Sequence, residues 1–365
     1  MEIRYESMRI DKGLIKEYQK QLEIDLKQIS GNNDIDLLLK DFANSFAHYI
    51  GTKYALAVNS GTDALQLALL GIGIKEGNSV LLPNVTYPAV ILSVMYTGAT
   101  PILVDVNEDD LQVNETLLEN KIRKDTKAII MAHMFSRAGD IDAIIKIAKK
   151  HHLYLIEDCC QAESSEFKGK KVGSFGDISC FSFSYYKPLS SCGGGGGMVC
   201  FNDEKYQKIA DYTRVWKDDQ VLLKAGQRFA SMNFLDLVAV KVKFKYLGKI
   251  IKSRLRAKKL YEDKLSGQKG IEIFKDNKNN LSVPQNFMIF SKTRDELGKY
   301  LQEKGIVWQR PYTPLHLMDI FSQFAKGDFP VSQKYYQKAI QLPLFSFMKE
   351  EEVIYVAKAI KDFFK

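Results

Sequence analysis

The sequence is poor in the residues that build disulfide frameworks and metal centres. Of its 365 residues, 5 are cysteine and 5 are histidine. The cysteines form no CxxC pair, and no histidine stands at zinc-site spacing from them. We therefore interpret them as reduced, small buried residues and expect no metal site. They lie close together in the chain, at Cys159, Cys160, Cys180, Cys192 and Cys200.

Long uninterrupted apolar segments are also missing. No charged residue lies between Asn78 and Val104, but prolines and a glycine divide that stretch into pieces shorter than a membrane span. The first 30 residues carry many charges, and they show neither the apolar segment nor the small-residue cleavage site of a secretory signal. We therefore expect no association with a membrane and a cytoplasmic location.

Acidic residues are absent from one strongly basic region. The chain has a formal net charge of +8, and many lysines and arginines but no acid lie between Leu237 and Tyr261. Apolar residues recur there at steps of three and four, which predicts an amphipathic helix with a basic face. The plain interpretation is a solvated face, and a sharper one is attraction of anionic substrates. No nucleic-acid-binding motif accompanies the charge, so we expect no nucleic-acid partner.

What is present is an alternation of short apolar runs and helical patterns, which is typical of βαβ units. It extends from residue 54 to residue 200. We expect strands near 54–58, 80–82, 101–104, 128–134 and 153–156, and helices near 62–70, 89–96 and 140–151. This order predicts an α/β fold in which helices cover both faces of a mainly parallel sheet. Ligands of such sheets bind beyond the carboxyl ends of the strands.

The chain is long enough for one large domain and a smaller one. We place the large domain at residues 1–240, with a helical segment over about residues 1–35. A linking helix and the small C-terminal domain follow at residues 241–365, with helices near 293–304 and 350–364. Two domains that meet at a cleft suit a small-molecule enzyme.

The first chemical signal is the sequence VNSGTDAL at residues 58–65. A strand ends there, Gly61 turns the chain, and a helix begins at Thr62. A helix N-terminus with free N–H groups and nearby hydroxyls binds phosphate. The alternative is an ordinary helix capped by Ser60.

The second signal is an acid at the end of a buried strand, in the sequence LYLIEDCCQA at residues 153–162. Burial of Asp158 costs free energy unless a cation meets its carboxylate. That cation is either a structural lysine or arginine, or the protonated ring nitrogen of a cofactor.

The third signal is a lysine after an aromatic run, in CFSFSYYKPL at residues 180–189, followed by five glycines at residues 193–197. Desolvation at such a place favours the neutral amine that Schiff-base chemistry requires, and glycines let the backbone pass close to a bulky ligand. By itself, Lys187 would be a surface lysine beside a flexible loop. With the phosphate-binding turn and Asp158, it completes the groups that pyridoxal phosphate (PLP) needs.

With these motifs the chain resembles the DegT/StrS-type nucleotide-sugar aminotransferases, PLP-dependent enzymes of fold type I. The resemblance begins with FANSFAHYIGT at residues 42–52. It continues through residues 101–106, His133, residues 173–177 and 181–183, RPYTPLH at 310–316 and LPL at 342–344. It implies a large domain with a mostly parallel seven-stranded sheet between helices, and a smaller C-terminal α/β domain.

The resemblance also implies roles for single residues around the cofactor ring. Lys187 would form the Schiff base with PLP, the internal aldimine, and would move the proton between the substrate carbon and the cofactor. Asp158 would keep the pyridinium nitrogen protonated, and Gln161 would hydrogen-bond the ring hydroxyl. Tyr87 matches the aromatic residue that stacks on the ring.

The phosphate-binding positions of the family match Gly61, Thr62 and Ser182. The family's Asn-x-Arg segment, which reaches the cofactor phosphate of the neighbouring subunit, corresponds here to Ser-Met-Asn at residues 231–233. Only the hydroxyl of Ser231 can fill that role.

Two further positions depart from the family pattern. Gly194 replaces an acidic residue within the glycine run, and Ser-Arg-Ala at residues 136–138 replaces the glycine-containing turn after His133.

The resemblance implies an aminotransferase that takes an amino group from an amino acid, glutamate, and passes it to the ketone of a nucleotide-linked deoxysugar, with ping-pong kinetics. It also implies a homodimer with active sites at the subunit interface. The alternatives are the same chemistry on a smaller phosphorylated ketone or a cyclitol, a PLP-dependent sugar dehydratase, and a PLP-binding regulator without turnover. Lys187 argues against the dehydratase, because those enzymes replace this lysine.

Overall fold

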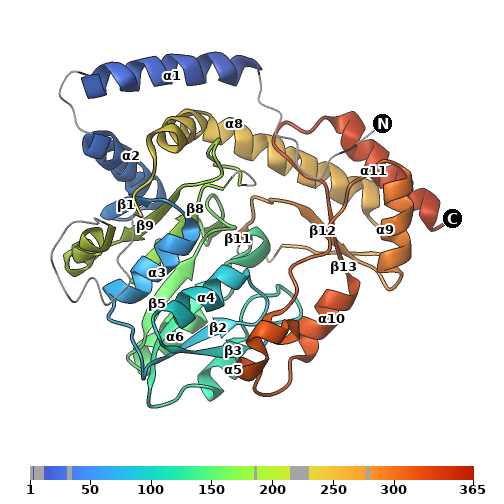
Figure 1. Cartoon of the computed structure of the whole chain (residues 1–365). Coiled ribbons are helices and arrows are strands. Elements are labelled where there is room, and N and C mark those ends of the chain that lie inside the picture. The colour runs from blue at the N-terminus through green and yellow to red at the C-terminus, as the bar shows by residue number, and fades with distance from the viewer. Residues whose placement is uncertain (1–2, 4–11, 31–34, 185–186, 214–229, 277–279) are drawn as a thin grey trace.

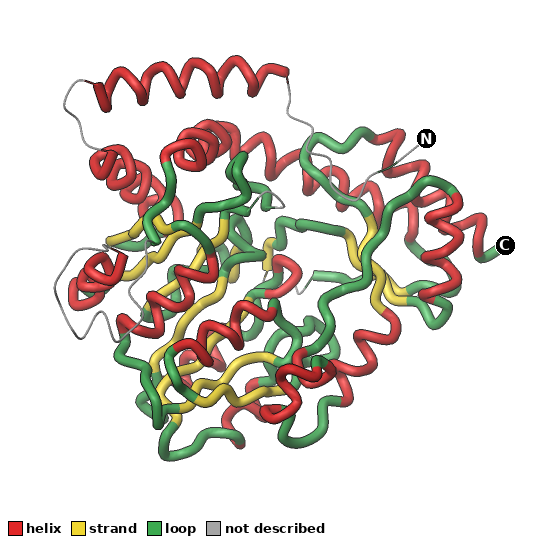
Figure 2. The backbone as a smooth tube through the Cα atoms, viewed as in Figure 1, coloured by secondary structure: helices red, strands yellow, loops and turns green. Residues whose placement is uncertain are grey.

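A seven-stranded sheet forms the centre of the larger part of the molecule (Figures 1 and 2). The structure is a computed structural model that describes residues 3, 12–30, 35–184, 187–213, 230–276 and 280–365. Neighbouring strands pair in parallel except at β9, which is antiparallel to both of its neighbours. This confirms the mostly parallel sheet. In spatial order the strands are β1 (Tyr54–Val58), β9 (Gly197–Phe201), β8 (Ile178–Ser182), β5 (Tyr154–Asp158), β4 (Thr126–Ala132), β2 (Ser79–Pro83) and β3 (Thr100–Val104).

Helices cover both faces of this sheet because successive strand residues point to opposite sides. Ile129 belongs to a core that includes residues of α2 (Ile35–Ile50), α6 (Ile141–Lys150) and the first half of α8 (Phe234–Leu265). The next residue, Ile130, belongs to a second core with α3 (Gly61–Gly71) and α4 (Pro88–Tyr96). The short helices α5 (Glu115–Asn120) and η2 (Glu204–Thr213) lie at the edges of this part.

The expected strands and helices of this region are present, with one difference in length. The uncharged stretch of residues 78–104 forms β2, α4 and β3. The predicted strand over 128–134 ends at Ala132, because the chain then enters the turn η1 (Met134–Ser136), in which Phe135 and Ser136 have left-handed backbone angles. Within the described residues, no helix is both long and apolar enough to cross a membrane.

A smaller sheet of order β10-β12-β13 forms the centre of the C-terminal part (Figure 1). The strands β10 (Glu272–Ile273), β12 (Phe287–Phe290) and β13 (Ala339–Leu342) pack with α9 (Arg294–Glu303), α11 (Glu350–Phe363) and the end of α8 around a separate core. The other elements of this part are α10 (Pro330–Lys338) and the turns η3 (Leu315–Leu317) and η4 (Asp319–Phe324).

Two elements join the two parts. Helix α8 gives Leu247 to a core of the large sheet and Tyr261 to the core of the small one, so the predicted domain boundary at residue 240 lies inside a continuous helix. That boundary stays a prediction. A third sheet pairs β11 (Asn280–Leu281) with β6 (Glu166–Phe167), which also pairs with β7 (Lys170–Lys171).

The helix α1 (Lys12–Ser30) lies along α8 (Figure 1). It accounts for part of the helical segment predicted for residues 1–35, of which residues 1–2, 4–11 and 31–34 lie outside the described residues. Lys241 forms an ion pair of 2.6 Å with the buried Asp25 of α1, and Lys245 donates a hydrogen bond to Gln21.

The basic helix is present, but a purely solvated basic face is wrong. Besides Lys241 and Lys245, Lys243 donates to Ser190, and Lys258 pairs with Asp276. These cations connect α8 to its neighbours. Because they already have partners inside the molecule, they contribute less to the predicted attraction of anionic substrates.

The prediction that the cysteines are all buried is also wrong in part. Cys159, Cys180 and Cys200 are buried and Cys160 is half-buried, but Cys192 is exposed. Cys192 stands in the loop before the glycine run, outside the sheet that buries the others.

Candidate active site

The carboxyl ends of three parallel strands meet at one edge of the large sheet. Gly197 at the start of β9 pairs with Val58 at the end of β1 on one side and with Ser182 at the end of β8 on the other. A Cβ atom on Gly197 would lie 2.6 Å from the carbonyl oxygen of Ser60. The missing side chain therefore lets the turn after β1 approach the end of β8.

The predicted phosphate-binding residues lie together at this edge. Gly61 begins α3, and a Cβ atom there would lie 2.8 Å from both the Cβ of Ser182 and the Sγ of Cys160. Ser60 caps the helix, because its Oγ accepts a hydrogen bond from the amide of Asp63. The half-buried Thr62 occupies the first turn of the helix. A helix N-terminus and the Ser182 hydroxyl thus face the same space, which suits a phosphate group.

Asp158 ends β5 at the same edge and is 6% exposed. Its carboxylate accepts a hydrogen bond of 3.0 Å from the amide of Cys160. In the described part of the chain, no lysine, arginine or histidine forms an ion pair with it, so the structural-cation alternative is not realised there. A buried carboxylate that lacks a cation is costly, and the protonated ring nitrogen of PLP is the group that fits it.

Gln161 is held by the turn after β4. Its Oε1 accepts a hydrogen bond of 3.1 Å from the amide of Phe135, and its carbonyl oxygen accepts one of 2.7 Å from the hydroxyl of Ser136. Phe135 and Ser136 have φ values of 56° and 63°. The turn therefore keeps a left-handed backbone without the family's glycine. Among the described residues, the side-chain Nε2 of Gln161 has no acceptor and is free to donate to a ligand.

Lys187 is also connected to Cys160, through Gln285. Its Nζ is 3.4 Å from the Oε1 of Gln285, whose Nε2 is 3.5 Å from the carbonyl oxygen of Cys160. The amide of Cys160 in turn donates to Asp158. Hydrogen bonds through Gln285 and Cys160 thus connect the predicted Schiff-base lysine, Lys187, to Asp158, the predicted partner of the ring nitrogen.

Two predicted residues have neighbours other than those described above. Tyr87 caps α4, is 53% exposed, and packs edge-on against Tyr312 with ring centres 5.6 Å apart. Ser231 forms a backbone bridge with Val58 of its own chain, beside the turn that leads into α3. Its role toward a neighbouring subunit stays a prediction.

Part of the glycine run packs against the start of α8. A Cβ atom on Gly193 or Gly195 would lie 2.7 or 2.6 Å from a carboxylate oxygen of Asp236, and the amide of Gly193 donates to that carboxylate. These two glycines therefore let the backbone pack against the first turn of α8. The approach of the glycine run to a bulky ligand stays a prediction.

One buried group has the composition of a metal site. Ligand atoms of His133, Glu157 and Cys159 lie within 4.8 Å of one another, and they are the one such group among the described residues. Burial raises the pKa of the Cys159 thiol, which favours the protonated form. The Glu157 carboxylate accepts hydrogen bonds from His133, from the amides of Gly173 and Gly176, and from a third amide, that of Phe175. This arrangement is that of a buried structural carboxylate whose hydrogen bonds come from one histidine and three backbone amides.

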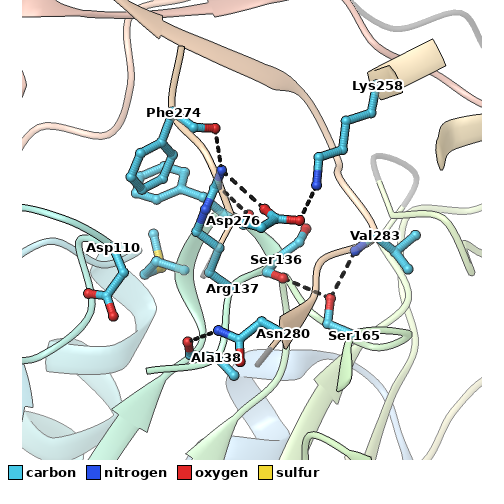
Figure 3. A network of polar contacts seen from close by, with 12 residues as sticks. Asp110, Ser136, Arg137, Ala138, Ser165, Lys258, Phe274, Asp276, Asn280 and Val283 are labelled. Carbon is cyan, nitrogen blue, oxygen red and sulfur yellow. Dashed lines mark hydrogen bonds and ion pairs between the residues drawn. The ribbon is translucent and has the colours of Figure 1, made fainter. Parts of the chain in front are cut away.

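A network of polar contacts fixes the site against the C-terminal part (Figure 3). The guanidinium of Arg137 donates to the carbonyl oxygens of Phe135 and Phe274 and pairs with Asp276 at 3.4 Å. Burial lowers the pKa of Arg137 to about 10, against the effect of Asp276. Lys258 contacts the same carboxylate. The turn that holds Gln161 is thereby tied to the smaller sheet.

Two residues beside Lys187 could not be identified from the sequence. Gln285 approaches it from a loop 98 residues away in the chain. Glu163 is buried, and its Oε1 accepts a hydrogen bond from the amide of Leu189. Burial raises the pKa of Glu163, and the nearby Lys187 ammonium lowers it. Glu163 follows Gln161 by two residues, and only its approach to Lys187 in the fold sets it apart from an ordinary loop acid.

Comparison with known proteins decides the family. The sequence profile described as the DegT/DnrJ/EryC1/StrS aminotransferase family matches residues 28–361. This chain belongs to that family. The DegT/DnrJ/EryC1/StrS enzymes depend on PLP, so the chain is a PLP-dependent aminotransferase of fold type I.

Similar members carry names that include their substrates or products. The chain is 32% identical to a GDP-perosamine synthase of Escherichia coli O157:H7, over 96% of each chain. It is 30% identical to a dTDP-3-amino-3,6-dideoxy-alpha-D-galactopyranose transaminase of Aneurinibacillus thermoaerophilus, over 99% of this chain and 98% of that protein. The crystal structure of S. venezuelae DesV in complex with a ketimine intermediate superposes with a TM-score of 0.90 at 26% identity, over 100% of this chain and 99% of that one.

Proposed function

We propose that the protein transfers an amino group from L-glutamate to the ketone of a nucleotide-linked keto-deoxysugar. The observation that carries this proposal is that Asp158 and Lys187 are both connected to Cys160, next to the N-terminus of α3. Among the described residues, Asp158 has no cationic partner. The names of the similar enzymes support the nucleotide-sugar acceptor. The enzyme would act in the cytoplasm in the biosynthesis of deoxyamino sugars and polysaccharides.

The residues around the cofactor have distinct tasks. PLP, when bound, withdraws electrons from the carbon atom that carries the amino group and so makes its proton removable. The Asp158 carboxylate would keep a proton on the ring nitrogen. The Nζ of Lys187 would accept the proton from the substrate carbon and return it at the next position. The Nε2 of Gln161 would donate to the ring hydroxyl and fix the tilt of the ring.

The phosphate and the open face of the ring have their own residues. The amides of Gly61 and Thr62 and the hydroxyl of Ser182 would bind the phosphate. Tyr87 would cover the ring face and exclude water, supported by its edge-on contact with Tyr312.

We further propose a homodimer in which the Ser231 hydroxyl reaches the cofactor phosphate of the partner subunit. The position of Ser231 beside the end of β1 keeps it at the phosphate edge of the sheet. Equilibrium sedimentation tests this proposal, because a fully active monomer would contradict it.

The acceptor is tested by the second half-reaction alone. The protein is converted to its pyridoxamine phosphate form with glutamate, freed of amino acid, and mixed with keto-deoxysugars linked to GDP or to dTDP. Recovery of the PLP absorbance with a nucleotide sugar is the expected result. Recovery only with a small phosphorylated ketone or a cyclitol ketone would refute the proposed acceptor while leaving the aminotransferase chemistry in place.

A further inference from the structure

Lys187 has one hydrogen-bond acceptor for its amino group within the described residues, and that acceptor is distant in the chain. The Nζ of Lys187 lies 3.4 Å from the Oε1 of Gln285, which stands between β11 and β12. The buried carboxyl of Glu163 is close enough to interact electrostatically with Lys187, but its hydrogen bond is to the amide of Leu189. Gln285 is therefore the group that receives the lysine directly.

The backbone around Gln285 is firmly anchored. We call residues 282–286 the strap. The amide of Val283 donates to the Oγ of Ser165, and the buried Arg254 of α8 donates to the carbonyl oxygens of Pro284 at 2.9 Å and Gln285 at 3.2 Å. A side chain carried by such a strap has a defined place relative to the large sheet.

The side chain of Gln285 is also registered on the turn that carries Asp158. Its Nε2 lies 3.5 Å from the carbonyl oxygen of Cys160, while the amide of Cys160 donates to Asp158. The Gln285 carboxamide makes these two contacts at 3.4 and 3.5 Å, longer than most N–H···O hydrogen bonds, so each one is weak. Such a group can accept the lysine without binding it tightly.

Aminotransfer benefits from a residue that keeps the released lysine near its target. The proposal that follows rests on the proposed function, in which Lys187 gives up its bond to the cofactor when the amino group is taken over, and forms it again later. A free lysine has a flexible four-carbon stem, and its reaction rate depends on how well it is kept near its target.

We propose that Gln285 is a positioning residue for Lys187. Its Oε1 accepts the Lys187 amino group while that group is not bonded to the cofactor and keeps it within reach of the reacting carbon and of the cofactor aldehyde. Because Gln285 belongs to the strap between the two sheets, the position of the smaller part sets the position of the lysine.

The test uses the full-length apoprotein and three variants. Gln285→Met keeps the length of the side chain but removes the acceptor and the donor, and Gln285→Glu keeps an acceptor oxygen but loses the donor to Cys160. Gln302→Met makes the same change on the exposed surface of α9. The measurement is the rate at which each apoprotein forms a Schiff base between PLP and Lys187, across the range from pH 6 to pH 10. Borohydride stops the reaction by reducing the Schiff base to a stable secondary amine. Mass spectrometry then locates this adduct at Lys187.

We expect Gln285→Met to capture PLP roughly 3- to 10-fold more slowly than the wild type, as for the loss of a weak hydrogen bond to a charged group. We expect Gln285→Glu to recover most of the rate at high pH, with its pH profile moved upward because a carboxylate stabilises the ammonium form. Gln302→Met should equal the wild type.

Two results would overturn the proposal in distinguishable ways. If Gln285→Met captures PLP like the wild type, or if Gln285→Glu is as slow as Gln285→Met at every pH, the residue only anchors the strap. If the wild type itself shows no PLP adduct at Lys187 after borohydride reduction, the proposed function fails, and this proposal fails with it.

Discussion

Gly61 lies so close to Ser182 that a Cβ atom on the glycine would come within 2.8 Å of the serine Cβ. This contact brings the N-terminus of α3 to the end of β8. No side chain fits between them, and the Sγ of Cys160 closes the third side at the same distance.

Gly61→Ala is therefore expected to push α3 away from Ser182. We expect a loss of stability of about 1–3 kcal/mol from overpacking and a PLP affinity weakened roughly tenfold, because a misplaced helix terminus loses part of its interaction with an anion. The affinity is measured by absorbance titration of the apoprotein. Gly248→Ala is the control, since a Cβ atom there would meet nothing within 4 Å in the exposed middle of α8. Equal PLP affinity of Gly61→Ala and the wild type would refute the close-contact argument.

Glu157 makes the free energy of unfolding depend on pH in the acid range. Burial raises its pKa, but the hydrogen bonds from His133 and the backbone amides outweigh burial and lower the pKa overall. The folded-state pKa thus lies below the unfolded value of about 4.3. Ionised Glu157 therefore stabilises the fold at neutral pH, and this stabilisation is lost as the pH falls through the folded-state pKa.

Glu157→Gln is expected to lower the free energy of unfolding by about 2–4 kcal/mol at pH 7, because buried donors lose a charged acceptor. The difference from the wild type should narrow as the pH falls below about 4. Urea unfolding at several pH values measures it, with the exposed Glu303→Gln as the matched control. A difference that stays constant with pH would show that the charge of Glu157 contributes nothing.

Asp110 affects the pH dependence of stability in the opposite direction to Glu157. Burial raises the pKa of its carboxyl to about 6, against the hydrogen bond from the Gln112 amide. The folded protein thus binds a proton more tightly than the unfolded chain, whose value is about 3.9, and stability falls as the pH rises from about 4 to about 6.

We expect Asp110→Asn to be more stable than the wild type by about 1 kcal/mol at pH 7.5, since asparagine keeps the acceptor oxygen without the charge. The gain should vanish near pH 4. Thermal unfolding at both pH values measures it, and the exposed neighbour variant Asp109→Asn should show no such gain. A gain of equal size at both pH values would mean that ionisation of Asp110 does not destabilise the folded protein.

Ser136 has a left-handed backbone in the turn where the family pattern contains a glycine. Ser136→Gly should be nearly neutral for stability, because relief of backbone strain of about 1 kcal/mol offsets the lost hydrogen bond to Gln161. Ser136→Ala keeps the strain and loses the bond, so we expect a cost of about 1–2 kcal/mol. Ser174 donates to a carbonyl oxygen too, that of Lys171, but has no positive φ. At position 174 we therefore expect the alanine variant to be more stable than the glycine variant, the reverse of the order at position 136. The same order of stability at both positions would contradict the account.

Much of the architecture and several site positions were predictable because their signals are local. The strand over residues 54–58 and the helices that follow it come from periodicity and from glycine and proline, which act within a few residues. Asp158 was singled out because a carboxylate at the end of an apolar strand is costly wherever the strand lies.

The errors concern partners that are distant in the chain. Neither the contact of the glycine run with Asp236 nor the ion pair between Lys241 and Asp25 leaves a trace in local sequence. Gln285 is a polar residue in a short loop, and only the packing of the two sheets brings it to Lys187. Such contacts depend on tertiary structure, which residue periodicity does not encode.

The central claim is that Lys187 bonds PLP and passes an amino group through it. The most direct measurement is the visible absorption spectrum of the PLP-loaded protein before and after addition of glutamate, beside a Lys187→Ala variant. We predict a yellow band that glutamate converts to the pyridoxamine phosphate spectrum in the wild type, and no such conversion in the variant. Absence of the band after PLP is added, or equally fast conversion by Lys187→Ala, would contradict the account.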